Sequence, residues 1–124
     1  MTTRSALREA TVGTPSVFKN KLVKYNELEF EVREISPGVR EQVRRKAENQ
    51  VLTKKNGDQE FILDAAKYTA HLIVMSTYVP GTQELVFEAG DVKAILNSPS
   101  GGFYKSLGDA ASELMVDAAE EGNE

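Results

Sequence analysis

The sequence predicts an α+β domain that is mostly helical, with a small N-terminal β-hairpin or sheet packed on three to four α-helices. Apolar residues alternate at period two before Ser36, which is typical of a strand with one buried face. The pattern stops at Ser36-Pro37-Gly38 and resumes at helical spacing, which predicts a strand that leads into a helix. At 124 residues the chain has the size of one domain and is long enough to bury a core.

Two strands are expected at the start of the domain, over 21–25 and 28–35. Asn26-Glu27 separates them and is short enough for a tight hairpin turn. A two-stranded hairpin is marginally stable alone, so this one must pack on helices or pair with another chain. Alternation in the second strand predicts that its apolar side chains share one face and its charged side chains the other. The apolar set is Leu28, Phe30 and Val32.

Helices are expected to make up most of the remaining chain, over 37–49, 65–78, 91–96 and 103–119. Ser36 and Asp64 are suitable N-cap residues for the first two of these helices. The helix over 65–78 is apolar on nearly every side, which is typical of a central helix. Val79-Pro80-Gly81 is expected to end it, and Leu85–Phe87 is expected to be a short extended piece.

The segment 50–59 contains Asn56-Gly57, a strong turn signal. It is compatible with a short hairpin and with a loop between helices, and we favour the loop. Residues 1–20 are expected to form a flexible arm, because no apolar face repeats along them. A single globular domain is expected over 21–119, and an acidic tail over 120–124.

Composition argues against several classes of protein. The absence of cysteine excludes disulfides, thiolate zinc sites and cysteine nucleophiles, and it fits a reducing compartment. A net charge of −4 argues against nucleic acid as a partner. The longest nearly apolar stretch, Ala70–Val79, is too short to cross a bilayer, so no membrane partner is expected.

No residue pattern indicates catalysis, a cofactor or a metal, so we expect a protein that is not an enzyme. His71 is the single histidine and lies in the most apolar helix, where a packed or boundary position is the commoner role. The segment 98–106 resembles a phosphate-binding loop, but Tyr104 stands where that loop requires glycine before its Lys-Ser pair. The carboxylates of the second strand are interpreted as solvation and edge protection.

Two groups of residues are candidates for contact with partners. Large apolar side chains on the last helix either form the internal core, which is the commoner use, or provide a surface for a client or for self-association. Basic residues on the first helix of the domain either form a solvated face or contact an acidic surface, such as another subunit's C-terminal tail. The apolar group is Phe103, Tyr104, Leu107, Leu114 and Met115, and the basic group is Arg40, Arg44 and Arg45.

The order of these elements from about Leu22 to Ala119 resembles the tail assembly chaperones of long-tailed (siphovirus-type) bacteriophages and prophages. The first phrases that carry the resemblance are Val32-Arg33-Glu34-Ile35 at the end of the strands and Ser36 at the start of a charged helix. A mainly apolar middle helix follows. After it come Leu85-Val86-Phe87, a helix start at Asp91-Val92 and a terminal amphipathic helix.

The resemblance implies a function without chemistry. Members of this family coat the tape measure protein before the tail tube assembles around it, and they self-associate. The implied partners are therefore the tape measure protein, further copies of this chain and, as an additional candidate, the tail tube protein, in the cytoplasm of a host bacterium. The alternative is a structural virion component, such as a head–tail joining or minor tail protein, which would remain in the particle.

Overall fold

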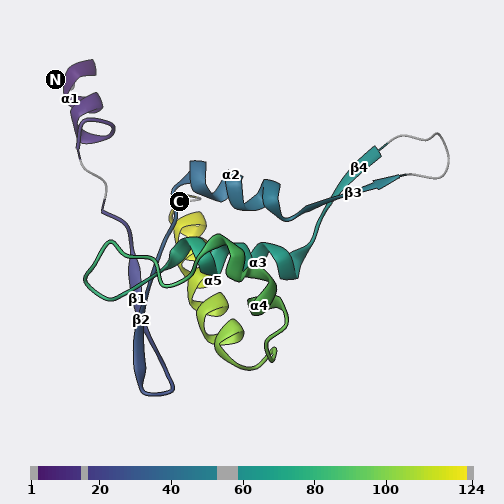
Figure 1. Cartoon of the computed structure of the whole chain (residues 1–124). Coiled ribbons are helices and arrows are strands. Elements are labelled where there is room, and N and C mark those ends of the chain that lie inside the picture. Colours follow the sequence, from purple (N-terminus) through teal and green to yellow (C-terminus); the bar gives the residue numbers. More distant parts are fainter. Residues whose placement is uncertain (1–2, 15–16, 53–58, 123–124) are drawn as a thin grey trace.

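A computed structural model of the protein describes residues 3–14, 17–52 and 59–122. It confirms the predicted α+β class, with α2, α3, α4 and α5 grouped beside a small antiparallel sheet (Figure 1). The elements are α1 (Arg4–Ala10), β1 (Asn20–Tyr25), β2 (Leu28–Arg33), α2 (Pro37–Lys46), β3 (Glu48–Leu52), β4 (Gln59–Leu63), α3 (Ala65–Ser76), β5 (Thr77–Tyr78), the 3-10 turn η1 (Ala89–Asp91), α4 (Val92–Leu96) and α5 (Phe103–Gly122).

The predicted hairpin is present as β1 and β2, which pair antiparallel from Tyr25↔Leu28 to Asn20↔Arg33. Asn26 and Glu27 form the turn with φ values of 50° and 65°, the left-handed geometry that matches the twist of a two-residue hairpin. Val32 is fully buried, but Leu28 at the tip is 66% exposed, so the buried face does not extend over the whole strand.

The sheet gains a third strand that the sequence pattern did not predict. We expected the middle helix to continue to Tyr78, but it ends at Ser76 and the chain turns into β5. β5 pairs antiparallel with β2 through Glu31↔Tyr78 and Val32↔Thr77. β-branched and aromatic residues fit a pleated, half-buried surface, and the open edge of β2 supplies the partner that a local pattern cannot show.

The core lies around α3, which has the central position that its apolar sequence predicted (Figure 1). α2, α4 and α5 pack against it, and the buried side chains of α3 include Leu72 and Ile73. Asp64 caps α3, since its side chain accepts a hydrogen bond from Lys67 N, and Ser36 caps α2 in the same way through Val39 N. α5 approaches α3 closely at Gly108, where an added Cβ would lie 2.8 Å from Thr69 Cγ2.

The preference for a loop between α2 and α3 was wrong. β3 and β4 form an antiparallel hairpin there, with a register that runs from Glu48↔Leu63 to Leu52↔Gln59. Its base is closed by a 2.9 Å hydrogen bond from Asp64 N to Ala47 O. β3 is mainly polar, so it lacks the alternation of apolar residues that indicates a strand. The Asn56-Gly57 turn signal lies outside the described residues.

A short helix, α1, lies within the predicted N-terminal arm. Thr3 caps it by accepting a hydrogen bond from Ala6 N, and every residue of the helix is exposed. Leu7 is 57% exposed, so the apolar side of α1 is not covered by the body of the protein. The flexibility of the arm remains a prediction.

A polar clamp holds the loop after β5 onto the sheet. Gly81 N donates to the Glu31 carboxylate over 2.9 Å, and Arg33 donates to the other carboxylate oxygen of Glu31. Arg33 also donates to Thr82 O and to Gln83 Oε1, and its guanidinium carbon lies 4.0 Å from the centre of the Tyr78 ring. Two of the charged residues that alternation assigned to solvent, Glu31 and Arg33, therefore bind a neighbouring loop, whereas Glu29 is exposed as predicted.

This clamp predicts a pH dependence of stability. The hydrogen bond from Arg33, followed by that from Gly81 N, lowers the pKa of Glu31 from its ordinary value of 4.5. The folded protein therefore binds this proton less readily than the unfolded chain. The contribution is fully present above about pH 4.5 and is lost as pH falls through the lower pKa of the folded state.

Glu31→Gln should therefore lower the free energy of unfolding at pH 7. It should also make the free energy of unfolding fall less between about pH 5 and about pH 3, a range that brackets the ordinary glutamate pKa. Urea unfolding measures both effects. Glu29→Gln is the matched control, because Glu29 is exposed on the same strand and has no side-chain hydrogen bond among the described residues. Equal pH profiles for Glu31→Gln and the unmodified protein would contradict the assignment.

Candidate binding groove

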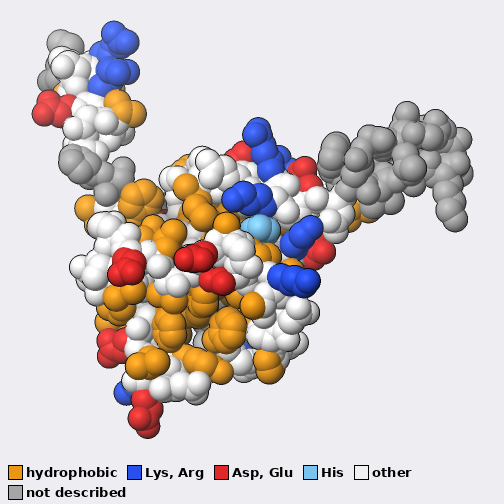
Figure 2. All heavy atoms as spheres, viewed as in Figure 1, with side chains coloured by type: hydrophobic (Ala, Val, Ile, Leu, Met, Phe, Trp, Pro, Cys, Tyr) orange, Lys and Arg blue, Asp and Glu red, His pale blue; other side chains and the backbone are white. Residues whose placement is uncertain are grey.

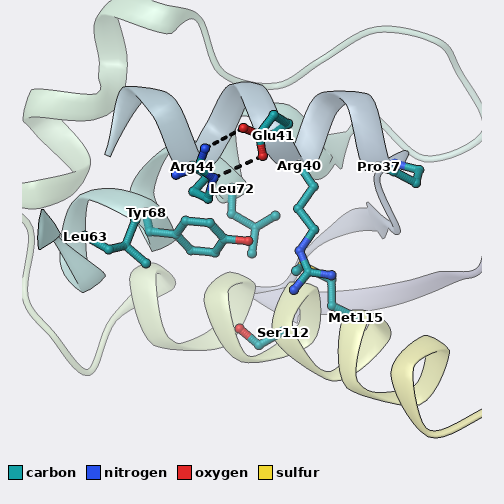
Figure 3. A pocket seen from close by; sticks show the side chains of 9 residues that line it. All are labelled: Pro37, Arg40, Glu41, Arg44, Leu63, Tyr68, Leu72, Ser112 and Met115. Carbon is teal, nitrogen blue, oxygen red and sulfur yellow. Dashed lines mark hydrogen bonds and ion pairs between the residues drawn. The ribbon is translucent and has the colours of Figure 1, made fainter. Parts of the chain in front are cut away.

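A groove of about 550 Å³ lies between α2 and α5, with α3 as its floor (Figure 3). We call it the α2–α5 groove. Three segments that are distant in sequence form it, because α2 and α5 both pack on the central helix without covering its whole surface. Its lining residues are Pro37, Arg40, Glu41, Arg44, Leu63, Tyr68, Leu72, Ser112 and Met115.

The floor of the groove is apolar and its α2 edge is charged. Leu72 is 2% exposed and forms the base, and the Tyr68 ring lies between the two helices (Figure 3). Leu63 is 47% exposed at the end next to β4. An apolar strip with a polar edge is the arrangement that receives the apolar face of a partner helix.

Two of the three candidate arginines are engaged within α2 and β3. Arg44 donates to both oxygens of Glu41 and also pairs with Glu48, and Arg45 lies 3.4 Å from Glu41. The hydrogen bond from Arg44 is the main cause of the lowered pKa of Glu41, and the same bond raises the pKa of Arg44. These exposed pairs offset much of the positive charge that the sequence pattern assigned to this face.

Arg40 differs from its two neighbours. It is exposed and makes no ion pair with any other residue that the structure describes. Its side chain extends from α2 toward α5 (Figure 3). Of the three arginines predicted to contact an acidic partner, Arg40 is therefore the main cation at the groove. Arg44 lies beside it and is paired with Glu41.

The apolar candidates on α5 are divided among different environments. Leu107 is 0% exposed and Leu114 is 7% exposed, so both belong to the core and cannot form a docking surface in this conformation. Tyr104 and Phe103 are half-buried, and Phe103 lines a second pocket beside the β1–β2 turn. Met115 lines the α2–α5 groove. The apolar stripe of α5 therefore forms mainly internal core. The sequence analysis gave this as the commoner use and a docking surface as the alternative.

The groove joins residues that sequence reasoning had placed in two separate sites. Met115 belongs to the apolar candidates and Arg40 to the basic ones, yet both line this groove. Tyr68, Leu63 and Ser112 were not singled out from the sequence. Tyr68 was one of two tyrosines on the predicted central helix, and this was the available signal.

His71 lies at the boundary between core and surface, which is one of the positions that the sequence analysis gave as its commoner role. It is half-buried, and Figure 2 shows the histidine at the surface near Lys and Arg side chains. Burial, together with Lys46 and Lys67, lowers its pKa, so the imidazole is mainly neutral at pH 7. No carboxylate within the described residues is hydrogen-bonded to it.

The described residues offer neither a metal site nor a membrane-spanning helix. No group of three His, Asp or Glu side chains there is arranged to hold a metal ion. None of the described helices combines the length and the apolar character that crossing a membrane requires. No family model matches the chain, and neither a curated protein nor a solved structure matches it.

Proposed function

We propose that this protein is a non-enzymatic tail assembly chaperone of a long-tailed phage or prophage that binds and solubilises the tape measure protein. The α2–α5 groove is the observation that carries the proposal, because it places the partly exposed apolar side chains of Leu63, Tyr68 and Met115 beside the Arg40 cation. The order of elements that resembles these chaperones supports the choice of client.

The groove is suited to an amphipathic helix. Leu63, Tyr68 and Met115 provide apolar contacts along it, and Glu41 and Arg44 are each 45% exposed at its edge. A tape measure protein is long, helical and apolar on one face, so it aggregates in water unless that face is covered. Many shallow contacts along such a client also permit later release, since the total affinity comes from multivalency.

Co-expression tests this function directly. The gene for this protein is expressed with the tape measure gene of the same phage, and the soluble fraction of the tape measure protein is measured with and without it. We expect a soluble complex that co-elutes on size exclusion. An unchanged soluble fraction, together with this chain in purified virions by mass spectrometry, would instead support a structural virion component.

The exposed cation should contribute to client binding. Arg40→Glu is expected to weaken binding to a client helix severalfold at low salt, because an acidic flank of the client would meet a like charge. The loss should diminish toward ~1 M salt, where the Debye length is about 3 Å. Binding is measured by fluorescence anisotropy with labelled tape measure peptides over a salt series.

Lys93→Glu is the matched control for this prediction. Lys93 is exposed on α4, has no ion pair among the described residues and does not line the groove. Equal losses from the two variants would mean that net charge, and not the groove, governs binding.

A further inference from the structure

A second apolar pocket, of about 260 Å³, lies beside the turn of the β1–β2 hairpin. We call it the hairpin-tip pocket. Leu28 is 66% exposed on one side of it, and Val86 is 36% exposed on the other. Phe103 forms its wall, with its ring centre 6.2 Å from that of Tyr25 and 6.0 Å from that of Phe87. Aromatic packing therefore holds this pocket in shape while its outer edge remains exposed.

Two of the three chain segments that line the hairpin-tip pocket are acidic, and the third, 103–107, contains one lysine and no carboxylate. Residues 24–30 and 84–91 contain five carboxylates and one lysine. Four carboxylates are adjacent in sequence to lining residues. Glu29 and Glu31 alternate with Leu28 and Phe30 along β2 and therefore lie on its other face. Glu27 in the turn and Glu88 after Phe87 remain, and both are exposed. Figure 2 shows Asp and Glu on the hairpin side of the apolar area, whereas most Lys and Arg lie toward α2 and α3. A cationic apolar segment is therefore the complementary ligand.

α1 has this complementary chemistry. Helical spacing of 100° per residue places Leu7 beside Ala10 and Ala6 on one side, with Arg4 and Arg8 adjacent to Leu7. Glu9 falls on a different side from the two arginines. The helix thus presents an exposed leucine with two cations on one side of it and two alanines on the other, and it is uncovered by the body of its own chain.

The positions of α1 and of the hairpin-tip pocket indicate how two copies of the chain would associate. The chain enters β1 at Asn20, and the pocket lies at the other end of the hairpin, about 20 Å away for six residues of strand. We propose that α1 of one copy docks in the hairpin-tip pocket of a second copy, with Leu7 among the aromatic side chains and Arg4 and Arg8 toward Glu27 and Glu88. The contact is head-to-tail, so a pair of copies keeps one free pocket and one free arm for further copies.

Sedimentation velocity on the purified full chain, without client, tests this contact over a wide concentration range. The unmodified protein should form larger species as concentration rises. Leu7→Glu and Leu28→Glu should each weaken association about tenfold or more, because a buried leucine is replaced by a carboxylate in an acidic pocket. Leu22→Glu is the matched control on β1, since Leu22 is 59% exposed and lies outside the pocket.

Three results would overturn the proposal. The first is a monomer at every concentration, including one in which α1 folds back on its own pocket. The second is association that survives both Leu7→Glu and Leu28→Glu. The third is association that Leu22→Glu abolishes and Leu28→Glu spares, which would place the contact at the free edge of β1.

A charge exchange tests the choice of occupant. The double variants R4E/R8E and E27R/E88R should each associate more weakly than the unmodified protein, and a mixture of the two should regain association. A mixture of folded variants that stays monomeric would overturn the charge pairing. These experiments use no client, so a negative result in them would not contradict the proposed solubilisation of a client. A negative result in the client experiment would likewise not contradict the proposed contact between copies.

Discussion

Leu107→Ala is expected to lower the free energy of unfolding by about 2 to 5 kcal/mol, the range for buried leucines that leave a cavity. Leu107 is 0% exposed and belongs to the core formed by α3, α5 and the sheet. A domain of this size has a total stability on the order of 5–15 kcal/mol, so the variant should unfold at a much lower denaturant concentration. Urea unfolding followed by circular dichroism measures the change.

Leu22→Ala is the matched control for this prediction, because it removes the same atoms from a side chain that is 59% exposed. Its effect should stay within about 0.5 kcal/mol. A Leu107→Ala variant as stable as this control, but unable to solubilise a client, would restore Leu107 to the docking surface that its sequence pattern had allowed.

Ser112→Trp is expected to abolish client solubilisation while the domain remains folded. Ser112 is exposed on α5 and lines the α2–α5 groove opposite Arg40 and Glu41, so an indole there would occupy the space that a client helix needs. Tryptophan is tolerated in an exposed helix position at a cost of less than about 1 kcal/mol. Co-expression with the tape measure protein gives the functional effect, and circular dichroism verifies the fold.

Ser100→Trp is the control that separates blockage from added bulk. Ser100 is exposed in the turn before α5 and does not line the α2–α5 groove. This variant should solubilise the client as well as the unmodified protein. Full solubilisation by Ser112→Trp would show that the client does not use the groove.

Local signals were sufficient for most of the fold. Ser36 and Asp64 marked the starts of α2 and α3, because an N-cap side chain satisfies backbone donors within its own turn. Alternation in β2 correctly placed Val32 in the core but not Leu28, which is 66% exposed. The apolar stripe of α5 marked the core residues Leu107, Ala110, Ala111 and Leu114. The two errors, β5 and the β3–β4 hairpin, concern strands whose partners are remote or whose residues are mainly polar.

The candidate site was less accessible to sequence reasoning than the fold. The sequence distinguished an apolar stripe from a basic face but gave no means to tell which members remain uncovered. Packing of α2 and α5 on α3 buried Leu107 and left Met115 at the groove. Ion pairs within α2 and β3 engaged Arg44 and left Arg40 exposed.

The α+β class, the caps and the hairpin followed from the sequence alone, since these depend on periodicity and on neighbours within a turn. Tertiary packing was needed to bring Glu31 and Arg33 onto a loop, Arg40 and Met115 into one groove, and Leu28 and Phe103 into one pocket. The two residues of each pair are exposed or buried according to how several elements pack together. Periodicity predicts which face of an element is apolar, and packing determines how much of that face is covered.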